Sequence, residues 1–206
     1  MGFYAKHVAP RLIDKLCGVA GMARYRENTC AGLTGTVLEV GFGSGNNIGY
    51  YPPAVTKILA VEPALTATKL AQKKLRGANV TVEMVGLRGE SIDLEDNSCD
   101  AALVTFVLCS VQDPQKVLSE IYRVLKPGGE FHFLEHGLAP DAKVAKWQRR
   151  IDPFEFSIAD GCLLTREPLK MFNDTAFEMV SSKERFTKGP KPWSYFTTGV
   201  ARKPAS

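Results

Sequence analysis

Residues 36–47 read TVLEVGFGSGNN, and this stretch decides the fold. Its first five residues, Thr36–Val40, are rich in β-formers and predict a short strand. Three glycines follow at alternate positions, Gly41, Gly43 and Gly45. Glycine lets a backbone turn sharply and lets a ligand approach closer than a Cβ atom would allow. The stretch therefore predicts a strand and a tight turn, which serves either the chain alone or a bound ligand.

Strands and helices alternate downstream of this turn. Short apolar or β-branched runs predict four further strands, over 57–61, 80–85, 100–107 and 130–135. Two intervening segments have the composition and boundaries of helices, 64–75 and 114–125, and the second of these is stopped by Lys126–Gly129. Strands that alternate with helices of this length predict an α/β fold with a parallel sheet and crossover helices.

The two ends of the chain follow other patterns. Apolar residues at helical spacing predict an amphipathic helix over 8–20, and a weaker helix follows over 22–30. Beyond residue 140 the alternation stops: residues 141–175 are helical and irregular, and 177–186 and 193–201 form two adjacent strands. We therefore expect a single domain of 206 residues whose α/β core is followed by an antiparallel hairpin.

Charge and cysteine content exclude several classes of protein. The formal net charge is +4, and residues 1–26 account for all of it. A nucleic-acid partner is not expected, because such proteins carry a broad basic face. The basic helix over 8–20 makes a peripheral contact with anionic lipid, contacts an acidic substrate, or is simply solvated. Five scattered cysteines without a C-x-x-C pair argue against a zinc ribbon or a disulfide framework, and favour a reducing, cytoplasmic location.

The glycine turn differs from a dinucleotide-binding loop. That loop reads G-x-G-x-x-G, whereas here Asn46 stands where the third glycine would be. Glu39 lies two positions before Gly41. A carboxylate there would repel a diphosphate but could hold an ammonium group. We therefore expect a cationic ligand without a phosphate.

Further carboxylates follow the second and third strands. Glu62, followed by Pro63, lies at the end of the second strand, where a carboxylate can accept hydrogen bonds from a ribose diol. Glu90 and Ser91 follow the third strand and could meet an adenine amino group. The alternative is that Glu62 begins a surface turn and that Glu90 belongs to an exposed loop.

These motifs resemble those of class I S-adenosylmethionine-dependent methyltransferases. The resemblance spans about residues 36–140 and rests on the glycine turn, Glu62-Pro63, Gly89-Glu90-Ser91 and LSEIYRVLKPGG at 118–129, in that order. A closer resemblance, to the methyltransferase-like thiol S-methyltransferases, covers five further segments. These are YYPP at 50–53, VLCSVQDP at 107–114, FLEHG at 133–137, KWQRRIDP at 146–153 and DGCLLTRE at 160–167.

The resemblance implies a fold, a cofactor and a set of binding residues. The fold is a Rossmann-like seven-stranded sheet in the order 3-2-1-4-5-7-6, with strand 7 antiparallel, helices on both faces and an N-terminal helical lid. The cofactor is S-adenosylmethionine. Gly41, Gly43 and Gly45 would pass beneath its methionine moiety, Glu62 would bind the ribose, Glu90 and Ser91 the adenine, and Thr105 would border the sulfonium.

The same resemblance divides the domain into three parts. Residues 1–30 would form a helical cap, 36–140 the donor-binding core, and 141–206 the acceptor-side helices and terminal hairpin.

The catalytic residues are sought at the carboxyl ends of the strands, where such crevices lie. His136 is a candidate base, or a structural histidine bonded to a loop carbonyl. Asp160 lines the acceptor pocket or caps a turn. A metal site built on His132 and His136 would lack a third ligand, so no metal is expected. Cys109 and Cys162 are expected to be small core residues rather than nucleophiles.

Four phenylalanines are also expected in the core rather than in a cage around the acceptor: Phe131, Phe133, Phe154 and Phe156.

The sequence therefore predicts an enzyme that transfers a methyl group from S-adenosylmethionine to a small molecule by in-line displacement. The segments beyond residue 140 favour a thiol or sulfide acceptor. One alternative is a quinone precursor or a lipid headgroup, supported by the basic amphipathic helix. Another is a module that binds the donor without turnover. Neither the acceptor nor the oligomeric state follows from the sequence.

Overall fold

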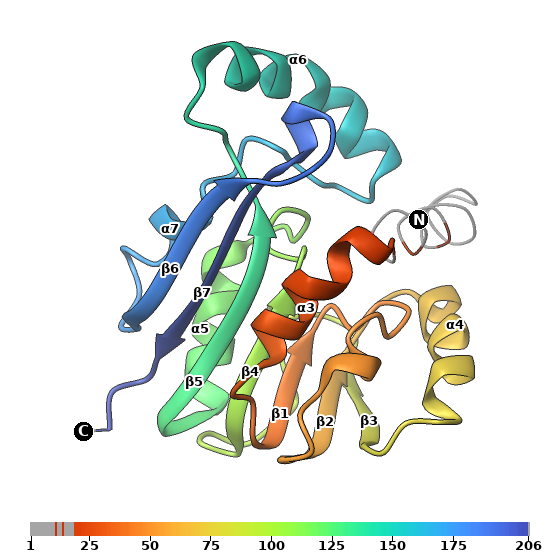
Figure 1. Cartoon of the computed structure of the whole chain (residues 1–206). Helices are drawn as coiled ribbons and strands as arrows, with labels where there is room; N and C mark the ends of the chain where they lie inside the picture. The colour runs from red at the N-terminus through yellow and green to blue at the C-terminus, as the bar shows by residue number, and fades with distance from the viewer. Residues whose placement is uncertain (1–10, 12–13, 15–18, 206) are drawn as a thin grey trace.

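The computed structural model describes residues 11, 14 and 19–205, which form a seven-stranded sheet with helices around it (Figure 1). The strand order is β3-β2-β1-β4-β5-β7-β6. This order confirms the prediction. The strands are β1 (Gly35–Val40), β2 (Val55–Val61), β3 (Thr81–Gly86), β4 (Cys99–Thr105), β5 (Leu125–His136), β6 (Glu178–Phe186) and β7 (Tyr195–Arg202).

The direction of the strands follows the two patterns in the sequence. Strands β1 to β5, each separated by a crossover, pair in parallel, whereas β7 runs antiparallel to both β5 and β6. The sheet order reverses between β1 and β4. In a parallel sheet this reversal opens a crevice at the carboxyl ends of the strands, because the two following segments leave in opposite directions.

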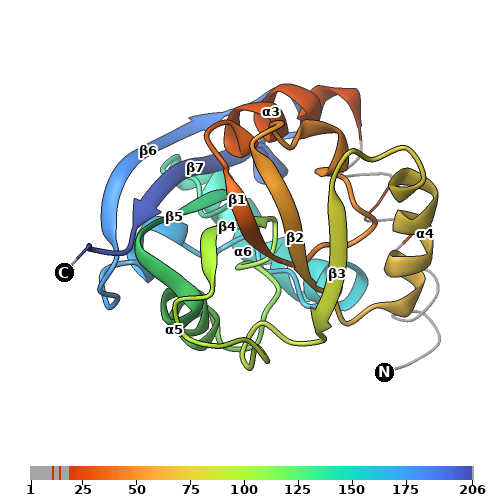
Figure 2. The same cartoon turned by 90° about the horizontal axis from the view of Figure 1, so that it is seen from below.

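Helices cover both faces of the sheet. Seen from below, α3 (Ala23–Cys30) and α5 (Pro114–Val124) lie on opposite faces, and α4 (Leu65–Leu75) lies beside β3 (Figure 2). Asp113 caps α5 by accepting a hydrogen bond from the Lys116 N–H. The remaining helices are α6 (Ala142–Ile158), α7 (Pro168–Met171) and the 3₁₀ turns η1 (Ala20–Met22), η2 (Ile48–Tyr50) and η3 (Lys191–Trp193).

Two apolar cores lie on the two faces. One packs α5 and the aromatic residues near α7 against β4 and β5, and includes Phe131 and Phe133. The other includes Cys30, Leu33 and Val37 and extends from the end of α3 across β1 and β2. The central strands are therefore buried on both sides, which is why they read as nearly continuous apolar runs.

Two sequence predictions were wrong in detail. Lys126–Gly129, expected to separate a helix from a strand, already belongs to β5, and a register irregularity opposite Cys99 and Ala101 accommodates the extra residues. Phe154 and Phe156, expected in the core, are 61% and 54% exposed. They lie on α6, which crosses the end of the sheet and buries only Ala145, Gln148 and Asp152 (Figure 1).

The amphipathic helix predicted for residues 8–20 lies almost entirely outside the described residues, as does the membrane contact expected from it. Within the described residues, no helix combines the length and apolarity needed to cross a bilayer.

Candidate functional site

The crevice at the reversal of strand order is bordered by four chain segments. They are the glycine turn after β1, Glu62 after β2, the loop that follows β4, and the end of β5 at His136. Each follows the carboxyl end of a parallel strand, so all four lie along one edge of the sheet.

The glycine turn contains three residues in the left-handed region, with φ of 74° at Gly41, 56° at Gly43 and 70° at Gly45. A Cβ atom at Gly41 would lie 2.2 Å from Val107 Cγ2, and one at Gly45 would lie 2.4 Å from Ile48 Cδ1. At Gly43 the nearest atom would be 3.8 Å away. Protein packing therefore requires two of the glycines, whereas Gly43 leaves free space above the turn.

Glu62 holds the glycine turn in place. Its buried carboxylate accepts one hydrogen bond from the Gly43 N–H (2.8 Å) and one from the Ala64 N–H (2.7 Å), with one oxygen used for each. Burial raises the pKa of Glu62 despite these bonds, and the charge of Asp160 adds to the rise. Each carboxylate oxygen keeps a lone pair for a further donor.

Glu39, which lies on β1 two residues before Gly41, is bonded to protein partners. It accepts hydrogen bonds from the Asn47 side chain (2.7 Å) and from the Tyr51 hydroxyl. Burial raises its pKa to about 7, and the bonds from Tyr51 and Asn47 oppose that rise. The ammonium contact expected from the sequence would therefore compete with these two side chains.

Arg26 and Asn47 complete this network, and neither was predicted from the sequence. The buried Arg26 guanidinium donates to the Asn47 Oδ1 (2.7 Å) and to the Thr105 Oγ1 (3.2 Å). The Asn47 amide also donates to Thr105 (3.1 Å). The Thr105 oxygen, predicted to border a sulfonium, thus faces protein donors. The sequence around Arg26 gave no sign of this role, because only the fold brings α3 to the end of β4.

The residues predicted to meet adenine lie at the end of β3. A Cβ atom at Gly89 would lie 2.7 Å from Val40 Cγ1, so the chain passes tightly against β1 there. Next to it, Glu90 is partly buried and Ser91 is exposed. Pro63 is exposed next to Glu62.

Asp14 contacts the glycine turn directly. Its carboxylate accepts a hydrogen bond from the Ser44 hydroxyl and forms an ion pair with Lys74 (3.2 Å). Lys74 also donates a hydrogen bond to the Asn46 side chain (2.7 Å). Burial tends to raise the pKa of Asp14, but the bonds from Ser44 and Lys74 lower it overall. Asp14 is thereby tied to the outer side of the glycine turn.

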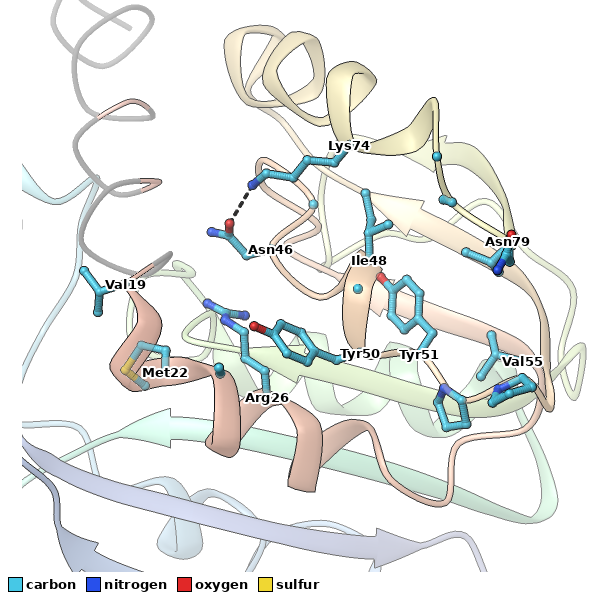
Figure 3. A pocket seen from close by; sticks show the side chains of 18 residues that line it. Val19, Met22, Arg26, Asn46, Ile48, Tyr50, Tyr51, Val55, Lys74 and Asn79 are labelled. Carbon is cyan, nitrogen blue, oxygen red and sulfur yellow. Dashed lines mark hydrogen bonds between the residues drawn. The ribbon is translucent and has the colours of Figure 1, made fainter.

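A cavity of about 720 Å³ lies on that outer side, between α3, η2 and the end of α4 (Figure 3). Arg26, Asn46, Tyr50 and Lys74 point toward it. Its lining does not include Glu62, Thr105 or His136. It meets the glycine turn at Gly45 and Asn46.

On the other side of the crevice, His136 lies against two cysteines. Its Nε2 is 3.1 Å from the Cys162 Sγ, and the Cys109 Sγ lies within 4.8 Å of both atoms. Hydrogen bonds from Cys109 and His136 lower the pKa of Cys162 to about 5. Burial works to lower the pKa of His136, but Cys162 outweighs it and raises that pKa overall.

Glu135 and Arg166 hold the loop that carries Cys109. The buried Glu135 carboxylate accepts hydrogen bonds from the Val107 N–H (2.8 Å) and Leu108 N–H (3.1 Å) through one oxygen. Arg166 donates to the carbonyls of Leu108 and Val111. Burial raises the pKa of Glu135 to about 7. Its second oxygen and the His136 Nδ1 are buried polar atoms without a hydrogen-bond partner in the described chain.

The two candidate catalytic residues have different surroundings. His136 stacks on Phe106, whose φ of 59° is left-handed, while Asp160 is exposed after α6 with a φ of 52°. Non-glycine residues in this conformation concentrate at functional sites. His132 is remote from both, because its Nδ1 bonds the Thr29 carbonyl at 2.7 Å. The two histidines therefore belong to different environments, and His136 has cysteine neighbours instead.

Comparison with known proteins gives consistent results. A family model for a methyltransferase domain matches residues 38–133. Thiol S-methyltransferase TMT1B of Rattus norvegicus is 38% identical over 168 residues, covering 80% of this chain and 67% of that protein. Its Homo sapiens counterpart is 36% identical and covers 82% and 70%. The Escherichia coli C-methyltransferase UbiE of ubiquinone and menaquinone biosynthesis is 33% identical over 105 residues, covering 48% of this chain and 42% of that protein.

Solved structures agree on the fold. A SAM-dependent methyltransferase from Aquifex aeolicus superposes with a TM-score of 0.64 at 18% identity, covering 94% of this chain and 98% of that chain. A geranyl diphosphate methyltransferase, solved in complex with SAM, gives 0.67 at 14% identity and covers 94% and 89%.

Proposed function

Because the chain belongs to the class I S-adenosylmethionine-dependent methyltransferases, with a small molecule as acceptor, we propose that this acceptor is a thiol or sulfide. The observation that carries the proposal is the extent of similarity to thiol S-methyltransferases. At 168 residues, the match to the rat protein is longer than the whole donor-binding core predicted at 36–140. It therefore includes residues outside that core, where the acceptor pocket is expected.

A quinone precursor remains the second candidate acceptor. The match to the quinone C-methyltransferase supports it, but covers only 48% of this chain. A match of that extent fits a shared donor site without a shared acceptor pocket, so the thiol is favoured.

The glycine turn and Glu62 are proposed to hold the donor. The open space at Gly43 fits a ligand that lies directly on the backbone, and the remaining lone pairs of Glu62 fit a ribose diol. Glu39 supplies negative charge beneath Gly41 and Gly45 rather than a direct contact. When bound, S-adenosylmethionine supplies an electrophilic methyl group on a sulfonium sulfur.

Glu90, Ser91, Pro63 and Thr105 are proposed to complete the donor site. The first two approach from the end of β3, Pro63 fixes the chain after Glu62, and Thr105 closes the β4 side through its bonds to Arg26 and Asn47.

The acceptor is proposed to lie between His136 and Asp160, beside the loop after β4. A thiol must lose its proton before it attacks, because the thiolate is the nucleophile. Most of the remaining catalysis is positioning, with the acceptor sulfur and the methyl carbon held about 3–3.5 Å apart away from water. The aromatic rings of Phe106 and Phe196, in edge contact, help to exclude water from this side.

The test is to incubate the protein with S-adenosylmethionine and matched pairs of acceptors. Each pair is a thiol and the alcohol of the same shape, with a quinol added as a third class. We expect S-adenosylhomocysteine and a methyl sulfide, detected by mass spectrometry, with the thiols alone. Faster methylation of the quinol than of any thiol would contradict the proposed acceptor, while leaving the methyltransferase assignment intact.

A further inference from the structure

Three separate segments bring sulfur and nitrogen atoms together beside the crevice. Cys109 comes from the loop after β4, His136 from the end of β5, and Cys162 from the turn after α6. We infer that these three residues form a binding site for a thiophilic divalent cation of the zinc class, and that the acceptor thiolate takes the fourth coordination position. The second half of this inference rests on the proposed function.

The ligand set has the chemistry and the spacing of such a site. Two thiolates and an imidazole are the groups that zinc binds in proteins, and a tetrahedral ion would place them about 3.5–3.8 Å apart. Here the Cys162 Sγ and the His136 Nε2 are 3.1 Å apart, and all three atoms lie within 4.8 Å of one another. Small side-chain rotations would therefore admit the ion.

The backbone that carries each ligand is already fixed. The Leu163 N–H donates to the Cys109 carbonyl (3.0 Å), which ties the two cysteine segments together. The Asp152 carboxylate accepts from the Leu164 N–H (2.7 Å). His136 pairs with Phe196 in the sheet. A site held by several elements before the ligand arrives is preorganised, which favours binding.

The site has three protein ligands. Among the residues that the structure describes, no fourth histidine, cysteine or carboxylate joins the group. Structural zinc sites are closed by four protein ligands, whereas sites with three keep a position for water or substrate. An open position beside a methyl donor suits a thiol, because a bound metal ion deprotonates a coordinating thiol.

One contact connects the cluster to the donor crevice. Two residues before Cys109, the Val107 side chain fills the space next to Gly41 of the glycine turn. A thiolate bound at the cluster would therefore lie on the same edge of the sheet as the donor.

The reaction balances without any redox partner. The acceptor thiol releases its proton to solvent when its sulfur binds the metal. A lone pair of that sulfur then forms the new bond to the methyl carbon, while the bond from that carbon to the sulfonium sulfur breaks. The products are a methyl sulfide and a neutral thioether, S-adenosylhomocysteine, and the metal ion keeps its charge throughout.

The first test measures metal binding directly. Protein purified with a phosphine reductant and stripped with a chelator is titrated with cobalt(II), and then with zinc(II). We expect one cobalt per chain, with thiolate-to-cobalt absorption and the strong visible bands of a tetrahedral site, both lost when zinc displaces cobalt. Cys162→Ser and His136→Gln should weaken cobalt binding by about tenfold or more.

The matched control is Cys99→Ser. Cys99 is also buried, but it lies at the opposite end of β4, so this variant should bind cobalt like the wild type. Circular dichroism and thermal melts establish that each variant is folded. Stripped wild-type protein that takes up no cobalt, or a Cys109–Cys162 disulfide in protein purified under reducing conditions, would overturn the metal site.

The second test addresses the acceptor. Adding a small thiol to the cobalt protein should increase the thiolate-to-cobalt absorption, because a third sulfur joins the ion, whereas the matching alcohol should not. Cobalt binding without any response to thiols would overturn the acceptor position. Metal-free protein that methylates thiols at the full rate would overturn the inference while upholding the proposed function. Absence of thiol methylation in the zinc-loaded protein would instead overturn the proposed function.

Discussion

The two sides of the crevice differ in how their buried carboxylates are bonded. On the β1–β2 side, both carboxylates have protein partners on each oxygen: Glu39 has Asn47 and Tyr51, and Glu62 has the N–H groups of Gly43 and Ala64. On the β4–β5 side, one oxygen of Glu135 and the Nδ1 of His136 have none within the described residues. The same edge of one sheet thus combines a half whose carboxylates are saturated and a half with an unsaturated carboxylate, which are called below the saturated and the unsaturated half.

This difference fits the two tasks of the enzyme. Because the methyl donor is the same in every reaction, the shape of the backbone can recognise it. The buried carboxylates on the proposed donor side can therefore have all their hydrogen bonds from the protein. Buried polar atoms without a partner reduce stability, by about 1–3 kcal/mol each. Such atoms on the β4–β5 side fit a site where a bound molecule or ion supplies the missing hydrogen bonds or coordination.

The largest effect is expected from a substitution in the glycine turn of the saturated half. Gly43→Val should abolish measurable binding of the donor in a calorimeter, because the new side chain fills the open space above the turn. Gly128→Val is the control, since Gly128 is also left-handed, with a φ of 80°, and also has open space, but lies at the start of β5. Each variant should lose about 1–2 kcal/mol of stability from backbone strain. Equal donor affinity in the two variants would contradict the assignment of the turn.

Glu62→Ala should come next. It removes the acceptor of the Gly43 N–H and the proposed partner of the ribose, so we expect donor affinity to fall by about 1–3 kcal/mol. Titration calorimetry checks this, with Glu83→Ala on the exposed face of β3 as control. If donor affinity is unchanged, the ribose lies elsewhere.

A substitution in the unsaturated half should change turnover rather than donor affinity. Cys162→Ser should lower the turnover of thiols by about 10- to 100-fold, because a serine hydroxyl replaces a thiolate. Donor affinity should stay at the wild-type value, and Cys99→Ser should change neither quantity. Steady-state kinetics and calorimetry separate the two. Loss of donor affinity in Cys162→Ser would show that the two halves are not independent.

The smallest effect concerns pH. The pKa of Glu39 rises from 4.5 to about 7 on folding, so the native protein binds a proton more tightly than the unfolded chain between these values. The contribution of Glu39 to stability should therefore decrease as the pH rises through this window. Affinity for a cationic donor should change oppositely, increasing a few-fold as Glu39 ionises. Both trends should flatten in Glu39→Gln, as followed by thermal melts and calorimetry, but not in Glu83→Gln.

The sequence predicted the saturated half in more detail than the unsaturated one. The strands, the glycine turn and the position of Glu62 follow from local signals, namely periodicity, glycine spacing and the end of a strand, whereas the strand order was implied by the family resemblance. Asn47 and Arg26 carry no such signal, because their roles depend on side chains that meet across α3, β1 and β4.

The cluster on the other half was missed for a similar reason. A metal site was not expected, because two histidines four residues apart had no third ligand at a suitable spacing. The structure instead places His136 beside cysteines that are 27 and 26 positions away in the chain. Each of the three residues comes from a different segment of the chain, so their positions in the sequence show no regular spacing. Only their presence in segments already singled out, VLCSVQDP, FLEHG and DGCLLTRE, pointed toward them.

The contact between Asp14 and Ser44 has a practical consequence. It joins Asp14 to the turn on which the donor is proposed to lie. Replacing Asp14 by alanine would release the outer side of that turn and change how fast the nucleoside enters and leaves. Rates of donor exchange should therefore be compared with and without this side chain before any difference is attributed to the catalytic residues.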